Sequence, residues 1–259
     1  MRARLVACRP IARVVPAARS LHSAARRWCA AAAMAAEGEH THWEGIWSAG
    51  LPKGSKFDCG RCEPSLQALL DGSFGGHECP LPPKGSAALV PGCGRGYAVA
   101  ALANAGFQTT GMELSETAAA AARQYLASEE GAPSHRVVGR DGHPLYMASV
   151  TVGDFFACEA AGAFSLVFDS TFLCAIPPAW RDRWAAQMAK LIKPGGQIVL
   201  NVFPIGDHEG GPPYALTPEI VDALLSGVGF EKIACDDTPE ELVARNFKGK
   251  EALARYRKK

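Results

Sequence analysis

The chain is predicted to fold as one α/β domain around a doubly wound, mostly parallel sheet with an antiparallel edge strand. Short apolar runs at 87–90, 107–112, 149–153, 164–168, 197–203 and 230–235 have the length and composition of strands. Alanine-rich or amphipathic segments with helical periodicity alternate with them, at 98–105, 118–127, 178–191 and 217–225. Such alternation is typical of a parallel sheet covered by helices on both faces.

The first strand runs into a loop with glycines at 92, 94 and 96, and a helix follows at once. Glycines let the chain turn tightly and let a ligand approach the backbone. The next strand ends in Glu113, about twenty residues past the start of the loop, where an acid can accept hydrogen bonds from both ribose hydroxyls. The third glycine comes one residue too soon for the dinucleotide pattern. The sequence therefore favours a ligand with ribose and adenine but no phosphate, such as S-adenosylmethionine, over an ordinary tight turn.

Net charge, hydropathy and cysteine content limit the classes of function that this chain is expected to have. The 259 residues carry a formal net charge of +1, so bulk charge gives no reason to expect a nucleic-acid partner. No apolar run reaches the length of a membrane span. The nine cysteines are scattered and are interpreted mostly as reduced intracellular thiols.

Residues 1–40 form a leader distinct from the domain predicted at 41–259. The leader is rich in arginine, alanine and serine, and its first acid is Glu37. That pattern is typical of a transit peptide and lacks the apolar core of a secretory signal. We expect targeting to a chloroplast or mitochondrion, whereas translation from Met34 would leave a cytoplasmic protein. A disordered leader is the simpler alternative.

The domain opens with Trp43 and Trp47, which are four residues apart and share one helical face. The pair is expected either to cap the core or to form a lid over the ligand, where an indole attracts a sulfonium. Further along the chain, a set of four possible ligands suggests a zinc site, namely Cys59, Cys62, His77 and Cys79. Their second pair lacks the two-residue spacing of zinc ligands, so unpaired thiols are favoured and no metal is predicted.

Later strand ends supply more candidate residues. Ser115 is placed to cap the helix that follows Glu113. Residues 129–147 are interpreted as a polar insertion on the surface. The strand at 149–153 ends at Asp154 and Phe155, which either hold an adenine or form a turn. Asp169 and Ser170 end the strand at 164–168 and are expected to face the ligand, because ligands lie outside the carboxyl ends of parallel strands.

The last third offers fewer candidates. Trp180, Trp184 and Met188 are assigned to the core face of the helix at 178–191. Asp207 and His208, in a long loop, are interpreted as loop hydrogen bonding rather than as an acid/base pair. Residues 246–259 are expected to form a basic helical tail on the surface.

Taken in order, the motifs resemble those of the thiopurine methyltransferase family, and most closely its plant-type halide/thiol branch. The Trp pair comes first, and the rest follow in the order Val90-Pro91-Gly92-Cys93-Gly94, Gly111-Met112-Glu113, Asp154-Phe155-Phe156, Phe168-Asp169, Lys193-Pro194-Gly195-Gly196 and Gly210-Gly211-Pro212-Pro213-Tyr214. The resemblance implies a class I S-adenosylmethionine-dependent methyltransferase fold. It also implies methyl transfer to a small soft anion, namely a halide, bisulfide or thiocyanate.

The resemblance also implies cofactor-binding roles. By position, Trp43, Trp47 and Phe57 would enclose the cofactor, and Gly92 would lie under it. Glu113 would hold the ribose, and Asp154 and Phe155 would frame the adenine. Ser170 would lie near the methionine end. No catalytic residue is implied, since a halide or thiolate needs no base.

Three of these positions depart from the family pattern. Phe57 stands where plant enzymes tend to have Trp, Glu113 replaces the usual Asp, and Ser170 stands where Tyr is common. The last change removes a phenol beside the reactive methyl, so it bears on substrate preference. The alternatives are S-methylation of an organic thiol, thiopurine or metalloid, a non-catalytic methyltransferase-like binding protein and, less favoured, a dinucleotide-binding reductase. The oligomeric state is not predicted.

Overall fold

A computed structural model describes residues 37–259, except 77–78, 133–136, 139–143, 146 and 245–249. The predicted leader lies almost entirely outside these residues. The main sheet of the described part has seven strands in the order β5-β2-β1-β6-β7-β9-β8. Its members are β1 (Ala87–Pro91), β2 (Gln108–Glu113), β5 (Ala148–Val152), β6 (Phe164–Ser170), β7 (Ile192–Ile205), β8 (Phe230–Asp237) and β9 (Lys250–Lys258).

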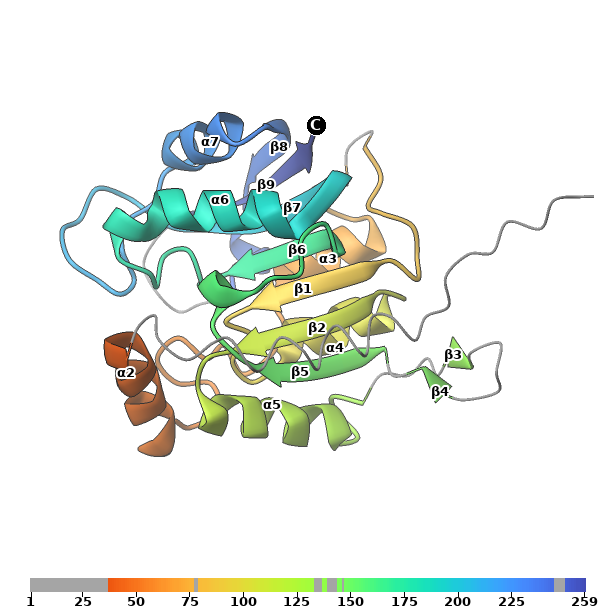
Figure 1. Ribbon diagram of the computed structural model, residues 1–259, viewed down its shortest axis with the longest axis vertical. Coiled ribbons are helices and arrows are strands. Elements are labelled where there is room, and N and C mark those ends of the chain that lie inside the picture. The colour runs from red at the N-terminus through yellow and green to blue at the C-terminus, as the bar shows by residue number, and fades with distance from the viewer. Residues whose placement is uncertain (1–36, 77–78, 133–136, 139–143, 146, 245–249) are drawn as a thin grey trace, which may run out of the picture.

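The sheet is mostly parallel, as predicted. β1 pairs in parallel with β2 and β6, and the same direction continues to β5 on one side and β7 on the other. β9 alone among these strands runs against its neighbours, next to the β8 edge. The carboxyl ends of β5, β2, β1 and β6 therefore meet at one edge, which Figure 1 shows on the left.

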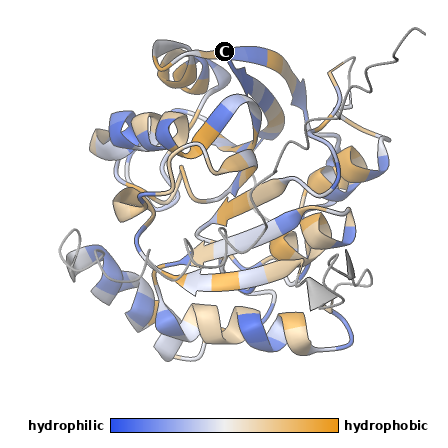
Figure 2. Cartoon of the chain, turned by 45° about the vertical axis from the view of Figure 1, so that its right-hand side comes forward, coloured by the Kyte–Doolittle hydropathy of each residue, from blue (hydrophilic) through white to orange (hydrophobic). Residues whose placement is uncertain are grey.

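Helices cover both faces of the sheet. The described helices are α2 (Glu37–Ser48), α3 (Pro64–Asp71), α4 (Tyr97–Asn104), α5 (Glu116–Ala127), α6 (Arg181–Leu191) and α7 (Pro218–Gly227). Successive strand residues point to opposite faces, so Ala88 and Val90 join the α3 and α4 layer while Leu89 joins the α6 and α7 layer. Figure 2 shows hydrophobic residues along the central strands and a mixture of hydrophobic and hydrophilic residues on the helices. α2 stands apart, beside the strand ends (Figure 1).

Helix starts follow the predicted capping. The Ser115 hydroxyl accepts a hydrogen bond from the Ala118 N–H, and Thr217 does the same for Ile220 at the start of α7. The 129–147 insertion is described only in part. Val137–Val138 and Pro144–Leu145 pair there as a two-stranded ribbon, β3 and β4.

The predicted helical tail at 246–259 is wrong. Within the described part, residues Lys250–Lys258 form β9, which lies between β7 and β8 and is mostly buried. Its Lys, Glu, Ala and Arg residues favour helices intrinsically, but two neighbouring strands override that preference. The buried Arg255 guanidinium is compensated by the carbonyl oxygens of Gly75, Gly76 and Cys79 and by the Gln197 amide.

Candidate functional site

A cavity of about 630 Å³ lies at the carboxyl edge of the sheet, beneath α2. A volume of this size suits a cofactor-sized ligand. All the residues predicted from the sequence to bind the cofactor line it: Trp43, Trp47, Phe57, Gly92, Glu113, Asp154, Phe155 and Ser170. The fold therefore brings together residues as distant in the sequence as Trp43 and Ser170.

The glycine loop after β1 forms part of the cavity floor. Gly92 has a φ of +55°, which favours glycine. A Cβ built on Gly92 would also lie 2.6 Å from Cδ2 of Phe172. Backbone conformation and close packing thus both require glycine at this position.

Glu113 is buried at the end of β2 and is held by backbone donors. Its Oε2 accepts a hydrogen bond from the Gly94 N–H at 2.8 Å, and its Oε1 accepts from the N–H groups of Leu114 and Ser115. Burial raises the pKa of this carboxyl, although the three N–H groups act in the opposite direction. These hydrogen bonds thus hold the glycine loop and the acid together.

Asp154 has an unsatisfied acceptor. Its Oδ1 accepts a hydrogen bond from the Phe156 N–H at 2.8 Å, whereas its buried Oδ2 has no hydrogen-bond partner among the described residues. Burial also raises the pKa of this carboxyl. Beside it, the Phe155 ring packs edge-on against Phe172, with centroids 5.0 Å apart. A buried acceptor without a donor is costly, so this position calls for a ligand N–H.

The cover of the cavity consists of α2 and the segment 49–63. Phe57 packs edge-on against both Trp43 and Trp47, with centroid distances of 5.6 and 5.9 Å. Glu44 docks α2 onto the start of α5, because its carboxylate accepts hydrogen bonds from the Ser115 hydroxyl at 2.6 Å and from the Thr117 hydroxyl and N–H. A carboxylate there also complements the helix dipole.

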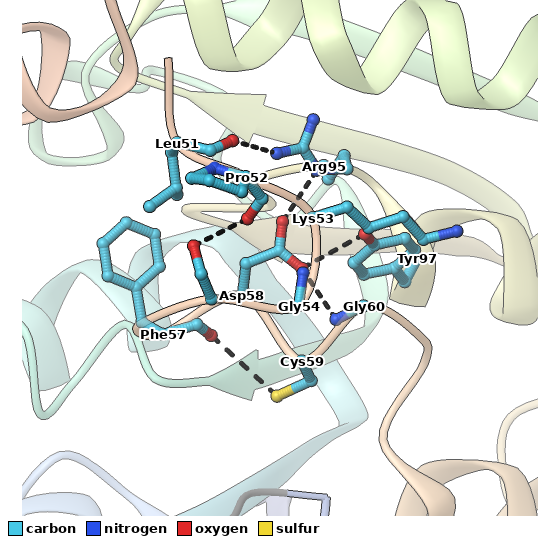
Figure 3. A network of polar contacts seen from close by, with 12 residues as sticks. Leu51, Pro52, Lys53, Gly54, Phe57, Asp58, Cys59, Gly60, Arg95 and Tyr97 are labelled. Atoms are coloured by element: carbon cyan, nitrogen blue, oxygen red, sulfur yellow. Dashed lines mark hydrogen bonds and ion pairs between the residues drawn. The ribbon is translucent and has the colours of Figure 1, made fainter. Parts of the chain in front are cut away.

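A second connection, which sequence reasoning missed, joins the cover to the glycine loop (Figure 3). The buried Asp58 carboxylate forms an ion pair with Arg95 Nε at 2.7 Å and accepts hydrogen bonds from the Tyr97 hydroxyl and from two backbone N–H groups, those of Gly54 and Gly60. Arg95 also donates to the Leu51 carbonyl and lies over the Trp47 ring, 5.3 Å from its centroid. Among the described residues, Arg95 thus supplies a cation that contacts the Trp47 ring.

Ser170 is tied to a carboxylate that the sequence did not single out. Its hydroxyl donates to Glu63 Oε1 at 2.6 Å and accepts from the Asn201 amide at 3.4 Å. Asn201 in turn accepts from the Ser65 hydroxyl. Glu63 precedes the proline that opens α3, so local sequence suggested only a helix start.

Comparisons with known proteins identify the family of this chain. The family model described as Thiopurine S-methyltransferase (TPMT) matches residues 39–259. The chain belongs to this family.

Two plant methyltransferases are similar to this chain over most of their length. A probable thiol methyltransferase 2 of Arabidopsis thaliana is 35% identical over 217 residues, covering 83% of this chain and 84% of the relative. Thiocyanate methyltransferase 1 of Brassica oleracea is 34% identical over 220 residues, covering 85% and 86%. The predicted resemblance to the plant branch of the family is thereby confirmed.

Solved structures agree on the fold. The crystal structure of Burkholderia thailandensis 1,6-didemethyltoxoflavin-N1-methyltransferase with bound S-adenosylhomocysteine has a TM-score of 0.57, is 14% identical, and covers 96% of this chain and 93% of its own. A Methanosarcina mazei S-adenosylmethionine-dependent methyltransferase has a TM-score of 0.55 at 18% identity, covering 68% and 94%. The predicted class I methyltransferase fold is confirmed.

One strand-end prediction is wrong. Asp169 does not face the cavity but is fully buried, and it accepts hydrogen bonds from the Phe172 and Leu173 N–H groups and from Trp184 Nε1. Burial raises its pKa to about 6. Neighbouring strand residues point to opposite faces, so only Ser170 of the pair lines the cavity. Trp180, assigned to the core, lines the cavity while packing against the core.

The structure also bears on the loop that contains His208 and on the four residues considered as zinc ligands. His208 Nε2 lies 3.0 Å from the Pro213 carbonyl oxygen, in agreement with loop hydrogen bonding. Cys59, Cys62 and Cys79 form no disulfide within the part of the chain that the structure describes, and His77 lies outside that part. Within the described ranges, no three His, Cys, Asp or Glu side chains gather as a metal site. No helix of the described part is long and apolar enough to cross a membrane.

Proposed function

We propose that this protein uses S-adenosylmethionine to methylate the sulfur of a small thiol or of thiocyanate. The observation that carries the proposal is the pair of acids on the cavity floor. Glu113 lies at the end of β2, and Asp154, with its unpartnered Oδ2, lies just past the end of the neighbouring β5. This spacing suits a ribose and the amino group of an adenine. The plant thiol and thiocyanate methyltransferases named above support the choice of sulfur as the nucleophile.

The residues present fit the methyl donor. Glu113 would hold the ribose, Asp154 and Phe155 would frame the adenine, and Gly92 would let the ligand lie against the backbone. Trp43, Trp47 and Phe57 would cover it, and Ser170 would lie near the methionine end. When bound, S-adenosylmethionine supplies an electrophilic methyl group, and its sulfonium leaves as a neutral thioether once the nucleophile's sulfur has taken that methyl.

The remaining wall of the cavity suits a soft nucleophile. Phe156, Phe172, Trp180 and Phe203 line it. Aromatic rings contact polarisable sulfur favourably and exclude the water that would solvate an anion. The chain's contribution is to hold the nucleophile and the methyl donor in line, and such positioning supplies roughly 7–11 kcal/mol in well-oriented reactions. A thiolate or thiocyanate needs no general base. Halides are nucleophiles of the same kind and belong to the same proposal.

A substrate panel tests the proposal. The full-length protein is incubated with methyl-labelled S-adenosylmethionine and, separately, with thiocyanate, bisulfide, iodide, bromide, chloride, a small organic thiol and a thiopurine. Headspace gas chromatography detects the volatile products, and liquid chromatography detects the others. We expect labelled methyl thiocyanate or methanethiol to form fastest. Calorimetric binding of S-adenosylmethionine without turnover of any nucleophile would indicate a non-catalytic binding protein, and absence of binding would contradict the proposal altogether.

We further propose that residues 1–40 direct the chain to a chloroplast or mitochondrion. The arginine-rich, acid-free composition supports this, and the family match begins at residue 39. A fluorescent protein fused after residue 40 is expected to enter the organelle, whereas a fusion that starts at Met34 stays in the cytoplasm. Cytoplasmic fluorescence from both fusions would contradict the proposal.

A further inference from the structure

Glu63, Ser170, Asn201 and Ser65 form a chain of hydrogen bonds below the cavity. Asn201 and Ser65 are almost fully buried, and Glu63 is 9% exposed. Only Glu63 and Ser170 of the four line the cavity. The chain of hydrogen bonds joins the end of the cover, β6 and β7, and it holds the Glu63 carboxylate at the carboxyl end of β6.

The order of the strands predicts how the ligand lies along the carboxyl edge of the sheet. Asp154 follows β5, Glu113 ends β2, Gly92 follows β1 and Ser170 ends β6, and these four strands are consecutive in the sheet. Neighbouring strands are about 4.8 Å apart, so the row spans roughly 14 Å, close to the length of an extended adenosyl amino acid. With the adenine at β5 and the ribose at β2, the amino-acid end lies over β1 and β6, beside Glu63.

The other carboxylates that line the cavity are either paired within the protein or lie away from the β6 end. Asp58 is paired with Arg95, and Glu113 accepts three backbone N–H groups. Asp154 lies at the opposite end of the row, and Glu39 on α2 accepts a hydrogen bond from Trp43 Nε1 at 3.2 Å. Glu63 is therefore the carboxylate placed at the β6 end. A carboxylate has about four acceptor directions, so a bond from Ser170 is compatible with a bond from a ligand.

We infer that Glu63 binds the α-ammonium group of the methyl donor's methionine portion and that Ser170 orients Glu63 for this contact. The inference rests on the proposed function and adds a residue to its site. Ser170 then acts through Glu63, and the phenol absent at position 170 is replaced by a serine–carboxylate pair. The ion pair fixes the amino-acid end and so positions the methyl group along the cavity.

A binding cycle tests the inference. Calorimetry measures the affinities of the wild-type protein and of Glu63→Gln for S-adenosylhomocysteine and for its deaminated analogue, which keeps the carboxylate but lacks the ammonium. We expect Glu63→Gln to weaken S-adenosylhomocysteine binding about tenfold or more, as for a hydrogen bond between charged groups. The same substitution is expected to leave binding of the analogue unchanged. Glu39→Gln, on the cover, is the matched control and is expected to affect both ligands equally.

Two results of these binding measurements would overturn the inference about Glu63. Equal losses for both ligands in Glu63→Gln would assign Glu63 a purely structural role, and no loss for S-adenosylhomocysteine would exclude the contact; either result overturns the inference. Failure of the wild-type protein to bind S-adenosylhomocysteine would instead contradict the proposed function. Should Glu63→Gln fail to fold, Ser170→Ala replaces it. That variant is expected to lower the wild-type preference for S-adenosylhomocysteine over the analogue, and an unchanged preference overturns the inference.

Discussion

The floor of the cavity is positioned by the backbone, whereas its cover is held by side chains. On the floor, Glu113 is fixed by three N–H groups, and Gly92 is fixed by its φ angle and by Phe172. The cover is attached through Glu44 to α5 and through Asp58 to Arg95. We therefore expect the floor to change only if the sheet edge changes. The cover can be loosened by one substitution while the sheet stays intact.

The largest expected effect is on the floor. Gly92→Ala places a Cβ against Phe172, which packs on Phe155, and strains a backbone with positive φ. We expect binding of S-adenosylhomocysteine to fall about 100-fold, as for a misplaced site, and the free energy of unfolding to fall by about 1–3 kcal/mol. Calorimetry and urea denaturation measure the two. Gly45→Ala on α2, where a Cβ meets no atom within 4 Å, is the control. Wild-type affinity in Gly92→Ala would show that the floor is not rigid.

The next effect is on the cover. Trp47 is 5% exposed and belongs to a small cluster with Leu51 and Ala118, separate from the two main cores. Trp47→Ala is expected to raise the KM for S-adenosylmethionine roughly tenfold, since a buried aromatic side chain contributes at least 1.5 kcal/mol, and to lower kcat as well. Steady-state kinetics with the best nucleophile of the panel provides the measurement. Full activity would eliminate the lid.

A smaller effect is expected at the connection between the two regions. Arg95→Ala removes the ion pair to Asp58 and the hydrogen bond to the Leu51 carbonyl. The KM for S-adenosylmethionine is expected to rise about fivefold, or roughly 1 kcal/mol. Hydrogen exchange should quicken in 49–60 but not in β1 or β6. Lys53→Ala, which breaks an exposed pair with Glu130, should change neither quantity. Unchanged exchange in the cover of Arg95→Ala would refute the role given to this ion pair.

The smallest effect depends on pH. Hydrogen bonds from Ser115 and Thr117 lower the pKa of Glu44 below its ordinary value of 4.5. Because the pKa of Glu44 is lowered when α2 is docked on α5, the contribution of Glu44 to this docking is complete above pH 4.5. It is lost as the pH falls through the lowered pKa. Hydrogen exchange in α2, measured from pH 6 to pH 3, is expected to quicken at the acid end in the wild type. Glu44→Gln should lack this acid-dependent step, and an identical pH profile in both proteins would count against docking through Glu44.

The same division separates what the sequence predicted from what it did not. The glycine loop, Glu113 and Asp154 were found because each follows directly from a strand end. The Asp58–Arg95 and Glu63–Ser170 contacts join residues 37 and 107 positions apart, and no local pattern signals them. Asp169 was misassigned because β6 is buried on both faces, so its alternation leaves no periodic trace in the sequence. The helical prediction for β9 failed because intrinsic preference cannot register two flanking strands.

The position of β9 also bears on the order of folding during synthesis. This strand, made from residues 250–258, separates β7 from β8, which are both translated before it. A nascent chain that has passed residue 237 holds the strands of the cavity floor, yet its β8 has no neighbour to pair with. β8 can join the sheet only after the ribosome exposes the β9 segment. Until then an unpaired β7 edge is open to other chains, and a chaperone that shields it would be expected to raise the yield of native protein.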